Sequence, residues 1–249
     1  LRVVTGRLRL GVGDMTILDA LAVAYAGGKR HRSALEEAYN LSSDLGHVAE
    51  TLVDKGLEGI RRFEVTVGRP IRPMLAERMP SAEEILERLG GKGAAEFKYD
   101  GLRIQAHLSP ERVFLFSRRL ENITDQFPDV VKTLRGSVKA KEAIVEGECV
   151  AVDPHTGDMF PFQMVSRRRG RKYEITRMME EIPVDIYLFD LLYLDGKDFT
   201  KVPYPQRRRE LEEIIQEGER VKLAKQFITD NRLELDEYMD TAIEKGCEG

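Results

Sequence analysis

The sequence predicts an α+β fold preceded by an all-helical segment. The first 62 residues show helical periodicity, and from residue 95 onward the chain carries short apolar or alternating runs bounded by turns. Helical patterns return between those runs without a regular strand–helix–strand rhythm. Strands with interspersed helices and no such repeat are typical of α+β domains.

Two segments carry the helical prediction for the N-terminal part. ILDALAVAYA at 17–26 and HVAETLVDKGLEGIRRF at 47–63 place apolar residues at positions i, i+3, i+4 and i+7. The turn LGVGD at 10–14 predicts that Asp14 is the N-cap of the first helix. Residues 64–73, EVTVGRPIRP, are extended and hold two prolines, which is typical of a linker.

The remaining elements are expected in the second part of the chain. SAEEILERLG at 81–90 predicts a helix that opens with a capping box, Ser81 followed by Glu84. Strands are expected at 95–108, 112–118, 143–153 and 184–196, and further helices at 207–216 and 235–246.

Composition excludes several classes of protein. With 42% hydrophobic and 33% charged residues, the chain can bury a core of its own. No apolar run approaches the roughly 20 residues that span a bilayer, so no membrane partner is expected. Two cysteines make no disulfide framework and indicate a reducing compartment. The many charges, the absence of Trp and the three Asn favour a thermophilic source.

Lys98 is the first candidate for chemistry. In AEFKYDG it lies in an apolar, strand-like stretch just before a turn at Asp100–Gly101. A lysine held there is expected to be partly desolvated, which favours the neutral amine that attacks electrophiles. The alternative is a strand-edge lysine with its ammonium in solvent, and the K-x-D-G pattern alone leaves both open.

A polar turn follows the strand VFLF. SRRLENIT at 117–124 is expected to direct Ser117, Arg118 and Asn122 toward a phosphate or a sugar. The formal net charge of −4 by itself argues against a wholly basic nucleic-acid binder, but the basic segment at 165–177 can still bind phosphates because the local field decides that contact.

Two later segments offer carboxylates and an aromatic ring. In VEGECVAVD, Glu146 and Glu148 share one face of a strand, because residues i and i+2 point the same way. Paired carboxylates there suit a metal ion or ribose hydroxyls. FDLLYLDG places Phe189 where it can stack a base. The structural alternatives are that the two glutamates form an ordinary polar strand face and that Phe189 is a core residue.

These motifs stand together in the order and approximate spacing of one family. KYDGLR, SRRLENIT, VEGE, FDLLYLDG and the terminal CEG resemble the nucleotidyltransferase motifs of ATP-dependent DNA ligases. LRLGVGDMTILDALA and RPIRPMLAE resemble the DNA-binding domain and linker of archaeal and eukaryotic ligases. Five ordered motifs with this N-terminal signature are far more specific than any one of them.

The resemblance implies a domain order. Residues 1–66 would be the C-terminal part of a helical DNA-binding domain, and residues 67–75 a linker. Residues 76–249 would be a nucleotidyltransferase (adenylation) domain of antiparallel sheets flanked by helices, incomplete at its C-terminus and without the OB-fold domain. Because the lysines that grip the triphosphate would then be missing, self-adenylation is expected to be badly slowed.

The resemblance also implies roles for single residues. Lys98 would be the catalytic nucleophile that attacks the α-phosphate of ATP, releases pyrophosphate and carries AMP to the 5′-phosphate of a nick, which the 3′-hydroxyl then seals. Asp100 and Glu146 would be supporting carboxylates. The other implied contacts are Glu96 with the adenine edge, Arg103 and Arg118 with sugar and phosphates, Glu148 with the ribose hydroxyls, Phe189 stacked on adenine, and Glu148 and Glu248 with Mg²⁺ or alternatively Mn²⁺.

The implied partner is nicked double-stranded DNA, with a sliding clamp bound through a region N-terminal to this chain. The implied state is a monomer in the cytoplasm of an archaeon or the nucleus of a eukaryote. The basic run at 167–172 is interpreted as a solvated loop in preference to a phosphate contact. Cations expected to hold duplex phosphates beside the LGVGD turn are Arg7, Arg9, Lys29, Arg30 and Arg32.

Two alternative functions stay open on the sequence alone. An RNA ligase or an mRNA capping enzyme would share the lysine nucleophile, and sealing of nicked RNA or use of GTP would distinguish them. A non-catalytic DNA-binding module with a vestigial nucleotide site would keep all its properties after Lys98→Ala.

Overall fold

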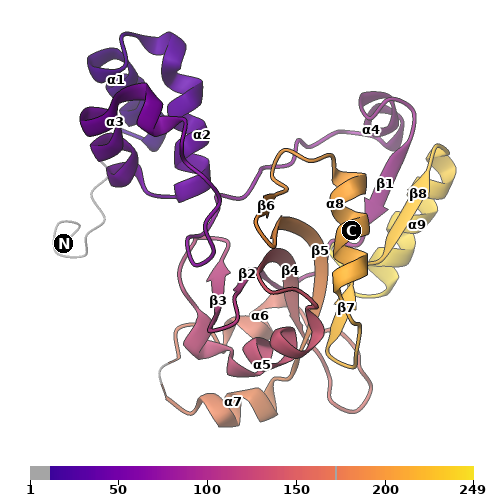
Figure 1. Cartoon of the computed structure of the whole chain (residues 1–249). Coiled ribbons are helices and arrows are strands. Elements are labelled where there is room, and N and C mark those ends of the chain that lie inside the picture. Colours follow the sequence, from indigo (N-terminus) through magenta and orange to yellow (C-terminus); the bar gives the residue numbers. More distant parts are fainter. Residues whose placement is uncertain (1–11, 172) are drawn as a thin grey trace. The chain divides into compact units, whose positions relative to one another are not determined.

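The chain folds into two compact units, divided in sequence between Pro73 and Met74 (Figure 1). The computed structural model describes residues 12–171 and 173–249. Each unit buries an apolar cluster of its own. Among the described residues, no helix is long and apolar enough to cross a membrane.

The first unit is helical, as predicted. Leu18, Leu35, Val48 and Leu52 are at most 2% exposed and form the centre of its apolar cluster. The elements are α1 (Asp14–Tyr25), a 3₁₀ turn (Lys29–His31), α2 (Arg32–Ser42) and α3 (Leu45–Ile60).

The prediction that Asp14 is the N-cap of α1 is wrong. The helix begins at Asp14 itself, because Gly13 has the extended backbone of the N-cap. The Asp14 carboxylate instead accepts a hydrogen bond of 2.6 Å from the Tyr39 hydroxyl, which accepts one of 2.7 Å from Arg72 Nη1. Burial and Asp14 raise the pKa of Tyr39 to about 12. These bonds hold the segment around Arg72 against α2, so the expected linker packs on the helical unit up to that point.

Most of the cations expected to hold duplex phosphates have partners inside this unit. Lys29 Nζ and Arg32 Nε lie 3.8 and 3.1 Å from carboxylate oxygens of Asp19. Arg30 Nε donates to the His31 ring at 3.1 Å. Arg7 and Arg9 lie outside the described residues.

The second unit holds two sheets. In the larger, the strand order is β3-β2-β4-β5-β6, and β7 joins it beside β5; the smaller pairs β1 with β8. Every pair is antiparallel except β5 with β7. The strands are β1 (Gly93–Glu96), β2 (Leu102–Leu108), β3 (Val113–Ser117), β4 (Ala143–Ala151), β5 (Val184–Leu194), β6 (Lys197–Asp198), β7 (Val221–Leu223) and β8 (Gln226–Thr229).

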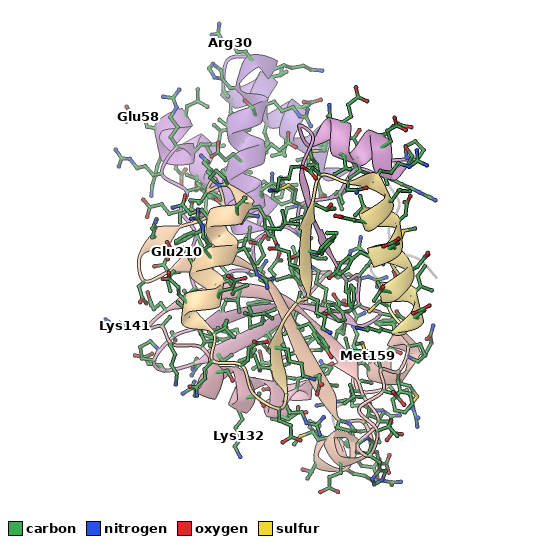
Figure 2. All side chains as sticks on the ribbon, turned by 90° about the vertical axis from the view of Figure 1, so that its right-hand side faces the viewer. Arg30, Glu58, Lys132, Lys141, Met159 and Glu210 are labelled. Atoms are coloured by element: carbon green, nitrogen blue, oxygen red, sulfur yellow. The ribbon has the colours of Figure 1, made fainter. Side chains whose placement is uncertain are left out.

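Helices flank these sheets, which confirms the predicted α+β class. Helices α5 to α8 contribute side chains to the apolar cluster of the larger sheet. Lys132 on α5 and Glu210 on α8 project outward from their helices (Figure 2). The helices are α4 (Ala82–Arg88), α5 (Pro128–Ser137), α6 (Phe162–Ser166), α7 (Ile175–Glu181), α8 (Tyr204–Ile214) and α9 (Arg232–Glu244), with a 3₁₀ turn at Thr124–Gln126.

Local signals predict some boundaries well and others poorly. The capping box is confirmed, because Glu84 N donates to Ser81 Oγ at 3.2 Å and Ser81 Oγ donates to Glu84 Oε1 at 3.4 Å. The single strand expected over 95–108 is wrong. The chain breaks at 97–101, and β1 and β2 belong to different sheets.

Strand alternation divides β2 between two environments. Ile104 and Ala106 are fully buried in the main apolar cluster. Arg103, Gln105 and His107 occupy the other face, where burial lowers the pKa of His107 to about 3. The Nε2 atom of that neutral ring lies 2.9 Å from Gln105 Oε1. This second face carries the polar groups of the candidate site.

The solvated-loop interpretation of the basic run is wrong for Arg168. Its side chain is 1% exposed and donates to both Asp129 oxygens, at 2.9 and 2.5 Å. The guanidinium carbon lies 4.6 Å from the centroid of the Phe127 ring. Arg169 pairs with Glu121 nearer the surface, and Lys172 lies outside the described residues.

We expect Asp129→Ala to destabilise the second unit by about 3 kcal/mol, because it leaves the buried Arg168 guanidinium without its carboxylate. Urea denaturation would measure the change. Glu121→Ala is the matched control, since it removes the exposed partner of Arg169 and should cost less than about 1 kcal/mol. Equal losses in the two variants would contradict the prediction.

Candidate functional site

Lys98 lies in the turn at 97–101 that joins β1 to β2. Its neighbours Phe97 and Tyr99 are each 6% exposed and pack in a separate apolar cluster, where the Tyr99 and Tyr187 rings stack 4.0 Å apart. Because successive extended residues point to opposite sides, the Lys98 side chain points away from this cluster and is 69% exposed. The expectation that Lys98 is partly desolvated is therefore wrong in this structure.

The backbone of Lys98 pairs with the last residues of the chain. Lys98 N donates to Gly249 O at 2.6 Å, and Glu248 N donates to Lys98 O at 2.8 Å. The Lys98 ammonium also contacts the Glu248 carboxylate. These bonds bring together two predicted site residues from opposite ends of the second unit.

Gly101 lets the lysine turn approach β4 closely. A Cβ atom at this position would lie 2.5 Å from Cys149 O and 2.8 Å from Glu148 Cγ, so no larger residue fits without a shift of backbone. The adjacent Asp100 accepts a hydrogen bond of 3.1 Å from Phe162 N, at the start of α6. The turn is thus fixed from two sides beside Glu148.

Glu148 lies at the centre of a group of charges. Burial raises the pKa of its carboxyl to about 7, Arg103, Lys98 and Arg118 act to lower it, and Asp100 acts to raise it. These charges come from the lysine turn, from β2, and from the loop after β3. The structure therefore brings Lys98, Arg103, Arg118 and Glu148 into one electrostatic environment.

Arg103 joins the predicted aromatic residue to the second glutamate. Its guanidinium carbon lies 5.0 Å from the centroid of the half-buried Phe189 ring, and its Nη2 donates to Glu146 Oε2 at 2.6 Å. Gln105 Nε2 donates to the other Glu146 oxygen at 3.0 Å. Arg103 Nε is buried and has no hydrogen-bond partner in the described part of the chain. Both oxygens of the Glu146 carboxylate are thus engaged by the protein.

The polar turn after β3 divides its residues between structure and surface. The Ser117 hydroxyl is buried and accepts from Arg119 N at 3.3 Å. The Asn122 carbonyl accepts from the Thr124 hydroxyl at 2.7 Å. Both side chains hold the turn, and Arg118 remains exposed beside it.

Glu96 is held by three residues that the sequence analysis missed. Its Oε1 atom accepts from the Tyr204 hydroxyl, from Arg208 Nη1 at 3.3 Å and from Gln226 Nε2 at 3.3 Å. Burial raises the pKa of the Glu96 carboxyl, and the three donors oppose that shift. The i, i+4 spacing of Tyr204 and Arg208 indicates a shared helix face, but no sequence signal connects that face to β1.

A cavity of about 400 Å³ lies between α4, α9 and β1. Its walls are mostly apolar and include Ile85, Leu89 and Met239. Of the residues to which the resemblance gives a role, Glu96 alone lines it. The cavity is therefore not where the predicted residues converge.

Known proteins resemble this chain over most or all of its length. Residues 73–249 match the family model described as an ATP dependent DNA ligase domain. The chain is 51% identical over its whole length to a DNA ligase of Staphylothermus marinus and 49% identical to a DNA ligase of Sulfolobus acidocaldarius. It spans about 42% of the length of each of these relatives.

A solved structure shares the fold. The chain named Pmar-Lig_PreS3 superposes with a TM-score of 0.51 and 17% sequence identity, over 80% of this chain and 45% of that one. The match to the family model covers every residue to which the resemblance gives a role, from Glu96 to Glu248. This chain belongs to the ATP-dependent DNA ligase family.

Proposed function

We propose that this chain carries out the nucleotidyl-transfer chemistry of ATP-dependent DNA ligation. The observation that supports the proposal best is the group formed by Lys98, Arg103, Arg118 and Glu148, which come from different elements of the second unit. A nucleophilic amine beside guanidinium groups suits attack on a phosphate, because nucleotidyl transfer depends on positioning and on neutralisation of charge.

In the first step, Lys98 Nζ loses a proton and forms a bond to the α-phosphorus of ATP. The bond between the α-phosphorus and the bridging oxygen to the β-phosphate breaks, and pyrophosphate leaves with the electron pair. The product is a lysine–AMP phosphoramidate. Arg103 and Arg118 would stabilise the negative charge of the phosphates.

The adenosine would be held by three residues. Glu148 would accept from the ribose hydroxyls, Glu96 would face the adenine edge, and Phe189 would stack on the base. Phe189 is half-buried, and the guanidinium carbon of Arg103 lies 5.0 Å from its ring centroid, so the base would stack on the part of the ring that Arg103 leaves open. AMP would then pass to the 5′-phosphate of a nick in duplex DNA, and the 3′-hydroxyl would displace it.

Glu148 and Glu248 are the proposed ligands of Mg²⁺. Within the described ranges, no three His, Cys, Asp or Glu side chains gather to hold a metal by themselves. Mg²⁺ is commonly bound through one or two carboxylates together with substrate phosphates, so this donor set fits an ion that binds with the nucleotide. When bound, the ion would neutralise charge on the phosphates, and Mn²⁺ would take the same oxygen donors.

We expect the chain to gain the mass of one AMP slowly, over a long incubation with ATP and Mg²⁺, and Lys98→Ala to gain none. Removal of the amine removes the group that forms the bond to phosphorus. Intact mass spectrometry measures the adduct, and Lys92→Ala, an exposed lysine before β1, is the matched control. An adduct that persists in Lys98→Ala would contradict the assignment of Lys98.

We expect the free energy of unfolding of Glu148→Gln to depend less on pH than that of the wild-type chain. The folded pKa of about 7 lies above the ordinary value of a glutamate, so the folded state binds more protons between these values. The wild-type chain should therefore lose stability relative to Glu148→Gln as the pH rises from about 4.5 to 7.5, by up to about 3 kcal/mol. Urea titrations at several pH values would measure it.

The matched control for Glu148→Gln is Glu213→Gln, at an exposed position on α8. This variant should follow the wild-type pH profile. A Glu148→Gln profile parallel to wild type would show that the Glu148 carboxyl titrates as it does in the unfolded chain.

A further inference from the structure

The Glu96 carboxylate is held through one of its two oxygens. Tyr204, Arg208 and Gln226 all donate to Oε1. In the region that the structure describes, no protein donor bonds Oε2, and the side chain is 26% exposed. The carboxylate is therefore fixed at one end and open to a ligand at the other.

The three donors are themselves fixed in place. Arg208 is 6% exposed, and its guanidinium also donates to Ala224 O at 3.0 Å and to Glu212 at 2.7 Å. Gln226 lies opposite Glu96 in the β1–β8 pairing, and its Nε2 also donates to the Tyr204 hydroxyl at 2.9 Å. The donors thus form a connected network.

The helix face that carries this network points inward. Tyr204 and Arg208 stand one turn apart on α8, and Glu210 marks the opposite, outward side of the helix (Figure 2). The Arg207 guanidinium lies 5.6 Å from the Tyr204 ring centroid and donates to both oxygens of Asp190, the residue after Phe189. The network is thereby attached to the strand that presents the aromatic residue of the site.

We propose that Tyr204, Arg208 and Gln226 are positioning residues that orient Glu96 so that its Oε2 accepts a hydrogen bond from the 6-amino group of a purine nucleotide. The inference rests on the proposed function, which places Glu96 at the adenine edge. It adds the residues that make Glu96 selective for a 6-aminopurine over a 6-oxopurine.

Orientation matters because the terminal torsion of a glutamate is otherwise broad. Three donors on Oε1 hold the carboxylate plane before the ligand arrives, so binding does not have to order it. A carboxylate oxygen accepts a hydrogen bond from the 6-amino group of the purine. The oxygen of a 6-oxopurine is itself an acceptor, so it cannot form this hydrogen bond and would be repelled by the carboxylate. A polar site built for one hydrogen-bonding partner rejects the analogue that lacks it.

Equilibrium binding of ATP and of inosine triphosphate tests the proposal. We expect wild type to bind ATP more tightly than the 6-oxo analogue. In the double variant Tyr204→Phe/Gln226→Met, which deletes two donors and keeps the side-chain volumes similar, the ATP dissociation constant should rise roughly tenfold. The dissociation constant of inosine triphosphate should change less than threefold. The preference for ATP, measured as the ratio of the two dissociation constants, should therefore decrease.

Tyr193→Phe is the matched control. Tyr193 lies on β5, and the variant deletes a hydroxyl that lies 3.4 Å from Glu142. Its ratio of the two dissociation constants should stay at the wild-type value. A wild-type ratio in the double variant would overturn the proposal. So would an equal loss of affinity for both nucleotides with a lowered melting temperature, which indicates a merely structural role.

Failure of the proposed function gives a different result. A chain that binds ATP with the expected selectivity but never acquires AMP on Lys98 would contradict the proposed chemistry and leave the role of the network standing. A chain that acquires AMP on Lys98, while the double variant keeps the wild-type preference for ATP, would support the proposed chemistry and overturn the positioning role of the network. A wild-type chain that binds neither nucleotide would overturn the positioning role.

Discussion

Alternation of side chains at the end of β1 is the constraint on which the candidate site depends. Phe97 and Tyr99 are buried in an aromatic cluster, and that burial fixes the direction of the residues between and before them. Lys98 is directed to the surface of the second unit, and Glu96 to the inward face of α8. A shift of this segment by one residue would bury the lysine and expose two aromatic rings.

The exposure of Lys98 means that burial cannot supply the neutral amine that the proposed chemistry requires. The exposed Lys98 ammonium contacts the carboxylate of Glu248, one of the proposed ligands of Mg²⁺. Positive groups brought close by the nucleotide complex, or the removal of Glu248 to another partner, would favour the neutral amine. Under the proposed function, Glu248 would exchange its contact with Lys98 for the metal ion.

Sequence reasoning predicted features that are local and missed those that depend on tertiary contact. The capping box at Ser81 and the shared face of Glu146 and Glu148 follow from spacings of two or three residues, and the structure confirms the box. The exposure of Lys98 was not predictable, because the apolar stretch around it has two sides. The contact between Tyr204 and Glu96 joins residues 108 positions apart, and nothing in either segment indicates it.

The pairing of Lys98 with Glu248 and Gly249 also has a consequence for biosynthesis. A ribosome makes the lysine about 150 residues before it makes the partners of that lysine. The emerging chain can form β2 with β3 early, since these strands are neighbours in sequence, but Lys98 stays without its backbone partners until α9 has been completed. Lys98 thus acquires these backbone partners only after Glu248 and Gly249 have been made.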